Sequence, residues 1–109
     1  AALDNTLRFV RAGGVIGVGN DYLGDDPPWA PVGMPFLEME CLLRAGLEMS
    51  EVIWAATRGG AVLLGRQDLG RIEAGCRADL LLLTEDPLTG PEAMSSVHCV
   101  IKDGVVLQT

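Results

Sequence analysis

The chain has 109 residues, of which 49% are hydrophobic and 21% are charged, and its formal net charge is −7. This acidic balance argues against nucleic acid as a partner, because phosphates have to be neutralised by Lys and Arg side chains. No apolar run reaches the roughly 18 residues that a membrane-spanning helix needs, which argues against a membrane protein. The high apolar fraction fits either a surface that binds a partner or a compact, leucine-rich domain.

The three cysteines, Cys41, Cys76 and Cys99, lie far apart and form no Cys-x-x-Cys pair. An odd number of cysteines in apolar or strand-like surroundings predicts buried free thiols and argues against structural zinc. Residues 1–12 carry several charges and do not match a signal peptide. A cytoplasmic location is therefore expected, since free thiols persist in a reducing compartment.

The N-terminal segment predicts a helix, a glycine pair and a buried strand. Residues 2–12 place apolar side chains at helical spacing, and Gly13-Gly14 ends this helix. Residues 15–19 are apolar and largely β-branched, which is typical of a buried strand. This order indicates half of a parallel α/β unit. Residues 22–33 are rich in proline and glycine and predict a loop long enough to suggest function.

Two further helices are expected in the middle of the chain. The first runs from Pro35, which suits the first turn, to the glycine at position 46. The second is predicted to have Ser50 as its N-cap and to end at Gly65. Gly59-Gly60 lies inside this helix, where glycine is unfavourable, and so indicates a break or a close packing contact.

The last forty residues predict β-structure. Leu80–Leu83 is apolar on both faces, which indicates a central or sandwiched strand, and Asp79 is expected to anchor the turn before it through backbone hydrogen bonds. Residues 97–101 and 105–107 flank Lys102-Asp103-Gly104. Asp-Gly between β-branched runs is a strong hairpin signal.

Four sequence blocks occur in an order that resembles the amidohydrolase superfamily, in particular its imidazolonepropionase, prolidase-like and deacetylase branches. The blocks cover residues 14–21, 38–47, 50–65 and 70–83, with the predicted hairpin behind the last one. Each block alone is a weak signal, whereas the ordered set covers nearly the whole chain.

The resemblance implies an α/β fold: the C-terminal segment of a (β/α)8 amidohydrolase barrel followed by strands of its small β-sandwich domain. Residues 1–65 would form the barrel segment, with a helix, the eighth strand at residues 15–19 and the helices after it. Residues 66–109 would form the β-sandwich segment.

Asp21 is the candidate catalytic residue, because it follows the predicted buried strand and opens an irregular loop. From the residues alone, it could equally begin a turn. The resemblance implies that Asp21 touches the metal and acts as general base toward the hydrolytic water. Asn20 departs from the Thr or Ser usual in the family. Tyr22 and Trp29 are candidate substrate-binding residues that could instead pack the loop.

The resemblance also implies a divalent metal, zinc being the expected one, in the intact enzyme. The histidine and lysine ligands of the family would come from earlier strands that this chain does not contain, and its sole histidine, His98, lies in the predicted hairpin region. A catalytic zinc needs about three protein ligands. The chain alone is therefore expected to bind no metal and to be inactive.

Two functional hypotheses follow. In the first, the chain is the C-terminal portion of a metal-dependent amidohydrolase that hydrolyses a C–N bond of a small-molecule amide, cyclic amide or amidine by metal-activated water. In the second, it is a non-catalytic module derived from such an enzyme that oligomerises or binds a partner. Its apolar composition predicts a homo-oligomer or association with the remainder of a barrel.

Overall fold

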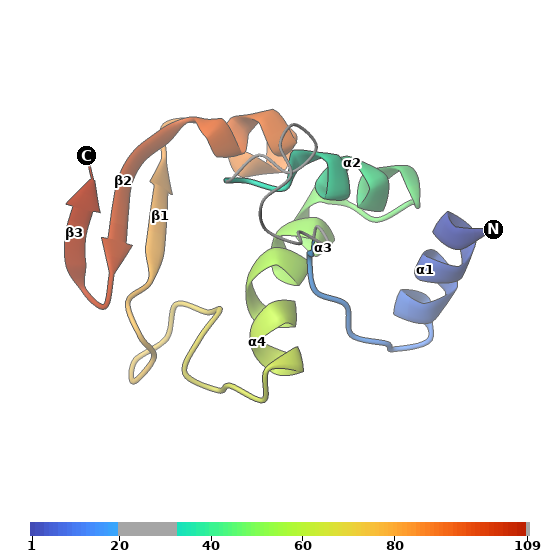
Figure 1. Cartoon of the computed structure of the whole chain (residues 1–109), viewed down its shortest axis with the longest axis horizontal. Helices are drawn as coiled ribbons and strands as arrows, with labels where there is room; N and C mark the ends of the chain where they lie inside the picture. Colours follow the sequence, from blue (N-terminus) through green and yellow to red (C-terminus); the bar gives the residue numbers. More distant parts are fainter. Residues whose placement is uncertain (20–32, 109) are drawn as a thin grey trace, which may run out of the picture.

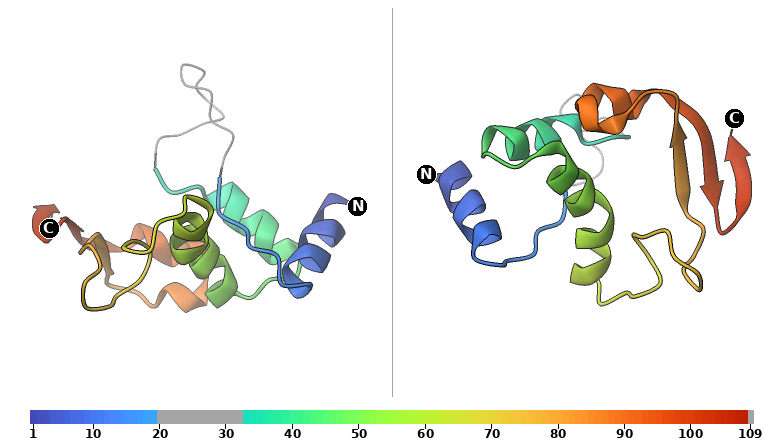
Figure 2. Two further views of the ribbon diagram at one scale, coloured as in Figure 1. Left: turned by 90° about the horizontal axis from the view of Figure 1, so that it is seen from below. Right: turned by 180° about the vertical axis from the view of Figure 1, so that it is seen from behind.

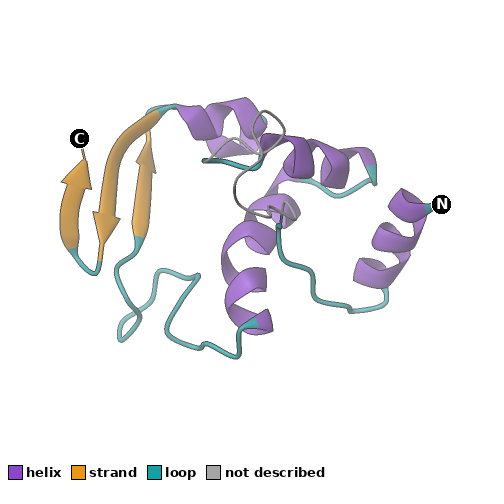
Figure 3. Ribbon diagram, in the orientation of Figure 1, coloured by secondary structure: helices purple, strands orange, loops and turns teal. Residues whose placement is uncertain are grey.

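The computed structural model describes residues 1–19 and 33–108. It places a group of helices beside a three-stranded antiparallel sheet, with the two ends of the described chain at opposite sides of the molecule (Figure 1). Helices occupy the first part of the chain, and the strands follow in its last third (Figure 3). The mixture of helices and strands agrees with the expected α/β character.

Helix α1 (Ala2–Arg11) confirms the first predicted element. The strand predicted at residues 15–19 is not formed within the described part of the chain, because this segment has no ladder with any described strand. The Val18 N–H instead donates a hydrogen bond of 3.3 Å to the Ala55 carbonyl oxygen, which belongs to a helix. A β-strand requires a strand alongside it, and the described strands all lie in the separate sheet.

Helices α2 (Phe36–Arg44) and α3 (Met49–Trp54) confirm the two predicted helices of the middle region. Their starts differ from the prediction, since Pro35 is the N-cap of α2 and Glu48, rather than Ser50, is the N-cap of α3. The Glu51 carboxylate accepts the Glu48 N–H at 2.8 Å. This capping-box contact, three residues back, begins the helix before Ser50.

Beyond Trp54 the helix continues without interruption but changes its winding. The π-helical segment η1 (Ala55–Gly59) follows α3 directly and leads into α4 (Gly60–Leu63). Gly65 then adopts a φ of +68°, which confirms its predicted role at the helix end.

The hydrophobic core lies among the helices. Met39 and Val52 are completely buried, and Leu42, Leu47 and Ala55 surround them. Met94 and the half-buried Leu83 extend this cluster toward the sheet. The core thus joins α2, the α3–η1 helix and the segment that precedes the second strand.

The sheet consists of β1 (Leu80–Leu83), β2 (Val97–Lys102) and β3 (Val105–Gln108), in the order β1-β2-β3. The expectation that β1 is central or sandwiched is wrong, because among the described residues it pairs only with β2 and forms an edge. The middle residues of β1 are correspondingly exposed, Leu81 by 40% and Leu82 by 42%. Two short 3₁₀ helices, η2 (Pro87–Thr89) and η3 (Pro91–Ser95), connect β1 to β2.

The hairpin predicted between β2 and β3 is confirmed. Asp103 and Gly104 adopt φ angles of 50° and 78°. Positive φ at both central residues is the requirement of a type I′ turn, which matches the right-handed twist of the two strands.

Candidate functional site

The three residues proposed as site residues, Asp21, Tyr22 and Trp29, lie outside the described residues, as does Asn20. Their assignments therefore stay predictions. The described segment that leads to them is residues 14–19, so the geometry of the candidate site begins with how this segment is held.

Residues 14–19 run along the α3–η1–α4 helix (Figure 2). The half-buried side chains of Ile16 and Val18 pack against the hydrophobic core. Together with the hydrogen bond from Val18 N–H to Ala55, this contact fixes both the side chains and the backbone of the segment. Alternate residues face the same side of an extended chain, which explains why Ile16 and Val18 reach the core together.

Glycines allow this close approach. A Cβ atom placed on Gly59 would lie 2.2 Å from the Ile16 carbonyl oxygen and 3.1 Å from the Trp54 ring. A Cβ atom on Gly17 would lie 3.0 Å from the Leu63 Cδ1 methyl. The close packing contact predicted for the Gly59-Gly60 pair is therefore confirmed, and its partner is the segment that leads to Asp21.

The sequence analysis did not anticipate the π-helical winding of Ala55–Gly59. A π-turn inserts one residue relative to an α-helix and occurs frequently at functional sites. Here it includes both the carbonyl that binds Val18 and the glycine that contacts Ile16. The only sequence signal for it is the glycine pair inside an otherwise helical pattern.

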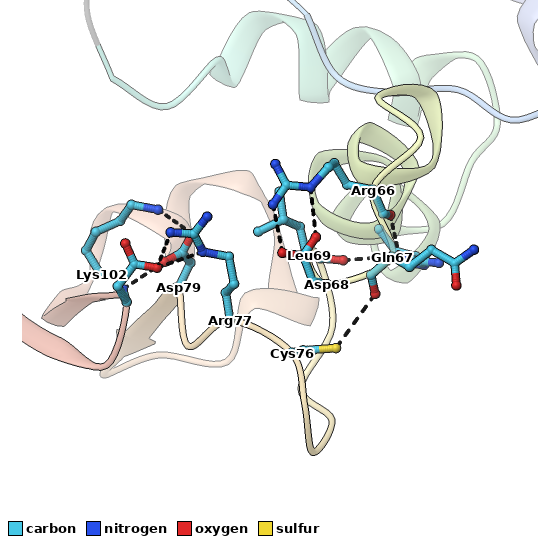
Figure 4. A network of polar contacts seen from close by, with 10 residues as sticks. Arg66, Gln67, Asp68, Leu69, Cys76, Arg77, Asp79 and Lys102 are labelled. Carbon is cyan, nitrogen blue, oxygen red and sulfur yellow. Dashed lines mark hydrogen bonds and ion pairs between the residues drawn. The ribbon is translucent and has the colours of Figure 1, made fainter.

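A second candidate region is the polar network between the helical end and the hairpin (Figure 4). Arg66 binds the Asp68 carboxylate through two hydrogen bonds of 2.8 and 2.7 Å. The Arg77 guanidinium donates a hydrogen bond of 2.7 Å to the Asp103 carboxylate. The backbone N–H of Arg77 donates a second one, of 2.9 Å, to the Asp68 carbonyl oxygen. The network therefore links the connecting segment to the hairpin turn.

Asp79 has a structural role, as expected, but it braces the hairpin turn between β2 and β3 rather than the turn that leads into β1. Its carboxylate accepts the Asp103 N–H at 2.9 Å and pairs with the Lys102 ammonium at 2.5 Å. The hydrogen bond from Lys102 lowers the pKa of Asp79 below its usual value, and the one from the Asp103 N–H lowers it further by a smaller amount. The hydrogen bonds from Arg66 likewise lower the pKa of Asp68 to about 2. Carboxylates held ionised in this way brace a turn and are poor general bases at neutral pH.

The described residues do not fit a catalytic metal. In residues 1–19 and 33–108, no three His, Cys, Asp or Glu side chains come together in a way that could hold an ion. His98 lies on β2, in the predicted hairpin region, and is exposed. Cys99 is a buried free thiol as expected, whereas Cys41 and Cys76 are free but only half-buried.

The described helices are all too short or too polar to span a membrane. An apolar cavity of about 560 Å³ lies between the helices and β1. Its lining includes Met34, Ile53, Ala56, Leu80, Leu83 and Met94. Thr57, Arg71 and Asp79 also line it, but the Asp79 carboxylate is already bound by Lys102 and by the Asp103 N–H.

Comparison with known proteins places this geometry in context. A family model described as the amidohydrolase family matches residues 5–108. An imidazolonepropionase from Streptomyces griseus is 42% identical over 107 residues, which cover 98% of this chain and 25% of the relative. An imidazolonepropionase from Mycolicibacterium smegmatis is 39% identical and is covered to 24% of its length. The chain thus spans about a quarter of the length of these curated relatives.

Solved structures give a similar result. A crystal structure of an amidohydrolase matches 98% of this chain with a TM-score of 0.80 and 31% identity, over 26% of its own length. A Xaa-Pro dipeptidase with bound methionine in its active site matches 97% of the chain with a TM-score of 0.76 and 30% identity, over 25% of its length. Molinate hydrolase matches 95% of the chain with a TM-score of 0.81 and 26% identity, again over 26% of its length.

Proposed function

Because the chain belongs to the amidohydrolase family, we propose that it is the C-terminal part of an amidohydrolase that hydrolyses a C–N bond of a small molecule. The observation that carries this proposal is the match to one family along nearly the whole chain, residues 5–108, together with 42% identity to an imidazolonepropionase. The share of each relative that is covered, about a quarter, supports a role as one portion of a larger enzyme.

The substrate class follows from the relatives. The curated relatives reported above are named imidazolonepropionases, so imidazolonepropionate, a cyclic amide, is the first substrate to test. The Xaa-Pro dipeptidase among the structural neighbours makes a linear peptide bond the second. Both substrates contain a carbonyl carbon bonded to nitrogen, which water attacks during hydrolysis.

We propose the same division of the chain as the sequence indicates, with residues 1–65 as a barrel segment and residues 66–109 as strands of a β-sandwich. In the described structure, helices precede Gly65 and strands follow it, which supports a division at that point. Residues 15–19 would take the place of the eighth barrel strand once neighbouring strands are present, and the packing of Ile16 and Val18, two positions apart, against the core supports this.

We assign the general base to Asp21, in the position that follows residues 14–19. The structure shows how those residues are held, and Asp21 itself remains a prediction. The described residues do not fit a metal site, so the ligands for a divalent metal such as zinc, apart from Asp21, would come from other parts of the enzyme. When bound, such a metal would supply an activated water; this chain would contribute the base and the backbone that carries it.

The alternative of a non-catalytic module that oligomerises or binds a partner is not favoured. The named relatives and structures reported above are all enzymes. The exposed leucines of β1 fit contact with the rest of an enzyme as well as they fit another partner.

The test uses the protein expressed from its natural reading frame, whose intact mass also shows whether this chain is part of a longer polypeptide. Loss of the substrate's ultraviolet absorbance measures hydrolysis of imidazolonepropionate, and a coupled amino-acid assay measures hydrolysis of Xaa-Pro dipeptides. Asp21→Asn should lower kcat by about 10²–10⁴-fold, the usual contribution of a general base. Asp25→Asn, in the same segment of sequence, is the matched control and should keep wild-type activity.

Two results would contradict the proposal. One is a natural protein that hydrolyses neither substrate although it is folded and supplied with zinc. The other is an active enzyme in which Asp21→Asn and Asp25→Asn have the same kcat.

A further inference from the structure

We propose that Gly59, the last residue of the π-helical segment η1, is a positioning residue for the C–N hydrolysis proposed above, and this inference rests on that function. Gly59 would act by seating the backbone of residues 16–18, which leads the chain to the candidate base Asp21. Nothing about Gly59 suggests a direct chemical role, since it has no side chain.

The contact is between two backbones. A Cβ atom on Gly59 would lie 2.2 Å from the Ile16 carbonyl oxygen, a separation that real Cβ atoms essentially never show. Because the opposing atom belongs to the main chain, no side-chain rotation can relieve the overlap. Any larger residue at position 59 has to displace the extended segment, the helix or both.

A second attachment lies one helical turn away. The Val18 N–H binds the Ala55 carbonyl at 3.3 Å, so positions 16 and 18 meet positions 59 and 55. The segment is therefore held at two points along the helix.

Two-point attachment makes the segment sensitive to small shifts. Displacing Ile16 by the 1 Å or more needed to admit a methyl group would tilt the chain about Val18 and move the residues that follow Gly19. A misplacement of about 1 Å can cost roughly 10²-fold in rate. Binding of substrate, which depends on other contacts, should change less.

The adjacent glycine is a matched control. Gly60 has helical φ and ψ angles of −59° and −43°, yet within the described part of the chain no atom lies within 4 Å of a Cβ atom placed on it. Gly59→Ala and Gly60→Ala therefore add the same methyl group to the same helix. They differ in whether that methyl meets Ile16.

The experiment compares the two variants in the natural protein, at a temperature well below both melting points. Gly59→Ala should lower kcat by about 10- to 100-fold with a change in KM below about threefold, which is the signature of a lost transition-state interaction. Gly60→Ala should keep both constants. Amide hydrogen exchange of Val18 should become at least about tenfold faster in Gly59→Ala only, while the core amide of Leu42 stays protected in both.

A second pair covers the case in which Gly59→Ala does not fold. A methyl on Gly17 would press the same segment away from the Leu63 methyl at 3.0 Å, and Leu63 is 60% exposed and can be shortened. Because the exposed Leu63 side chain can turn aside, Gly17→Ala should lower kcat less than Gly59→Ala does, and Gly17→Ala combined with Leu63→Ala should restore the wild-type kcat. A purely structural role predicts no such rescue of kcat among folded variants.

The outcomes separate the two proposals. A wild-type protein without hydrolase activity contradicts the proposed function, and the Val18 exchange rates then still decide whether Gly59 seats the segment. An active wild type in which Gly59→Ala and Gly60→Ala share the same kcat and the same Val18 exchange overturns the inference alone. So does a folded Gly17→Ala variant in which Val18 exchanges faster while kcat is unchanged.

Discussion

Replacing Gly70 by alanine tests how the connecting segment is docked on the helix. Gly70 has a φ of +76°, and a Cβ atom there would lie 2.6 Å from the Thr57 carbonyl oxygen and 2.8 Å from the Arg58 Cα atom. The left-handed conformation costs an alanine about 1–2 kcal/mol. The overlap with rigid backbone adds about 1–3 kcal/mol, the range seen for overpacking. The free energy of unfolding should therefore fall by about 2–5 kcal/mol.

Gly75 separates these two contributions. Its φ is +89°, and no described atom lies within 4 Å of a Cβ atom placed on it. Gly75→Ala should therefore lose only the conformational part, about 1–2 kcal/mol. Urea denaturation followed by circular dichroism measures both variants, with the slope of the transition compared to confirm that unfolding is two-state. Equal losses in Gly70→Ala and Gly75→Ala would refute the docking contact.

Two further predictions concern the core and the polar network. Met39 is completely buried, so Met39→Ala should lower the free energy of unfolding by about 2–5 kcal/mol. Leu37→Ala, at a position 74% exposed on the same helix, should change the free energy of unfolding by less than about 0.5 kcal/mol. Urea denaturation measures both variants, and equal losses would contradict the assignment of Met39 to the core. Lys102 lowers the pKa of Asp79 in the folded protein. The ion pair between Asp79 and Lys102 therefore stabilises the protein fully above the ordinary carboxyl pKa of about 4. This stabilisation is lost as the pH falls through the lower pKa that Asp79 has in the folded state. The melting temperature of Asp79→Asn should therefore fall less steeply than that of wild type below pH of about 4; Glu85→Gln, at an exposed carboxylate, should follow wild type, and a wild-type slope in Asp79→Asn would contradict the assignment.

Features that depend on neighbouring residues could be predicted from the sequence. Helical spacing located α1, α2 and the α3–α4 helix, and Asp103-Gly104 located the hairpin turn. The glycine pair at positions 59 and 60 correctly indicated a close contact, although not its partner. Each of these signals is local, because it depends on residues within a few positions of one another.

Features set by distant pairing could not be predicted. An apolar, β-branched run at residues 15–19 is compatible with a strand, but a ladder forms only where another strand lies alongside. Leu80–Leu83 is apolar on both faces, and this pattern indicates only what covers the two faces of the strand. It does not indicate which strands pair with it through hydrogen bonds, so the edge position of β1 was not predicted. The start of α3 was missed for a different, local reason: the Glu51 carboxylate binds the Glu48 N–H three residues back, and this contact outweighed the general preference for serine at the N-cap.

The candidate site divides in the same way. The sequence pointed to Asp21, through its place after an apolar run and through a family resemblance, and that assignment stays a prediction. The support beneath it, a π-turn whose carbonyl and glycine hold residues 16–18, depends on contacts between segments some forty positions apart along the chain. No local pattern encodes such a contact.

The β1-β2-β3 order of the sheet has a consequence for the sequence of events in folding. Within the described residues, each strand pairs only with strands next to it along the chain, from Leu83 with Val97 to Lys102 with Val105. Such pairings close short loops, whose entropy cost is low and whose formation is fast. The contact of Val18 with Ala55 has to close a loop of roughly forty residues, which costs more conformational entropy. We therefore expect the sheet to assemble early and the segment that leads to Asp21 to dock on its helix late.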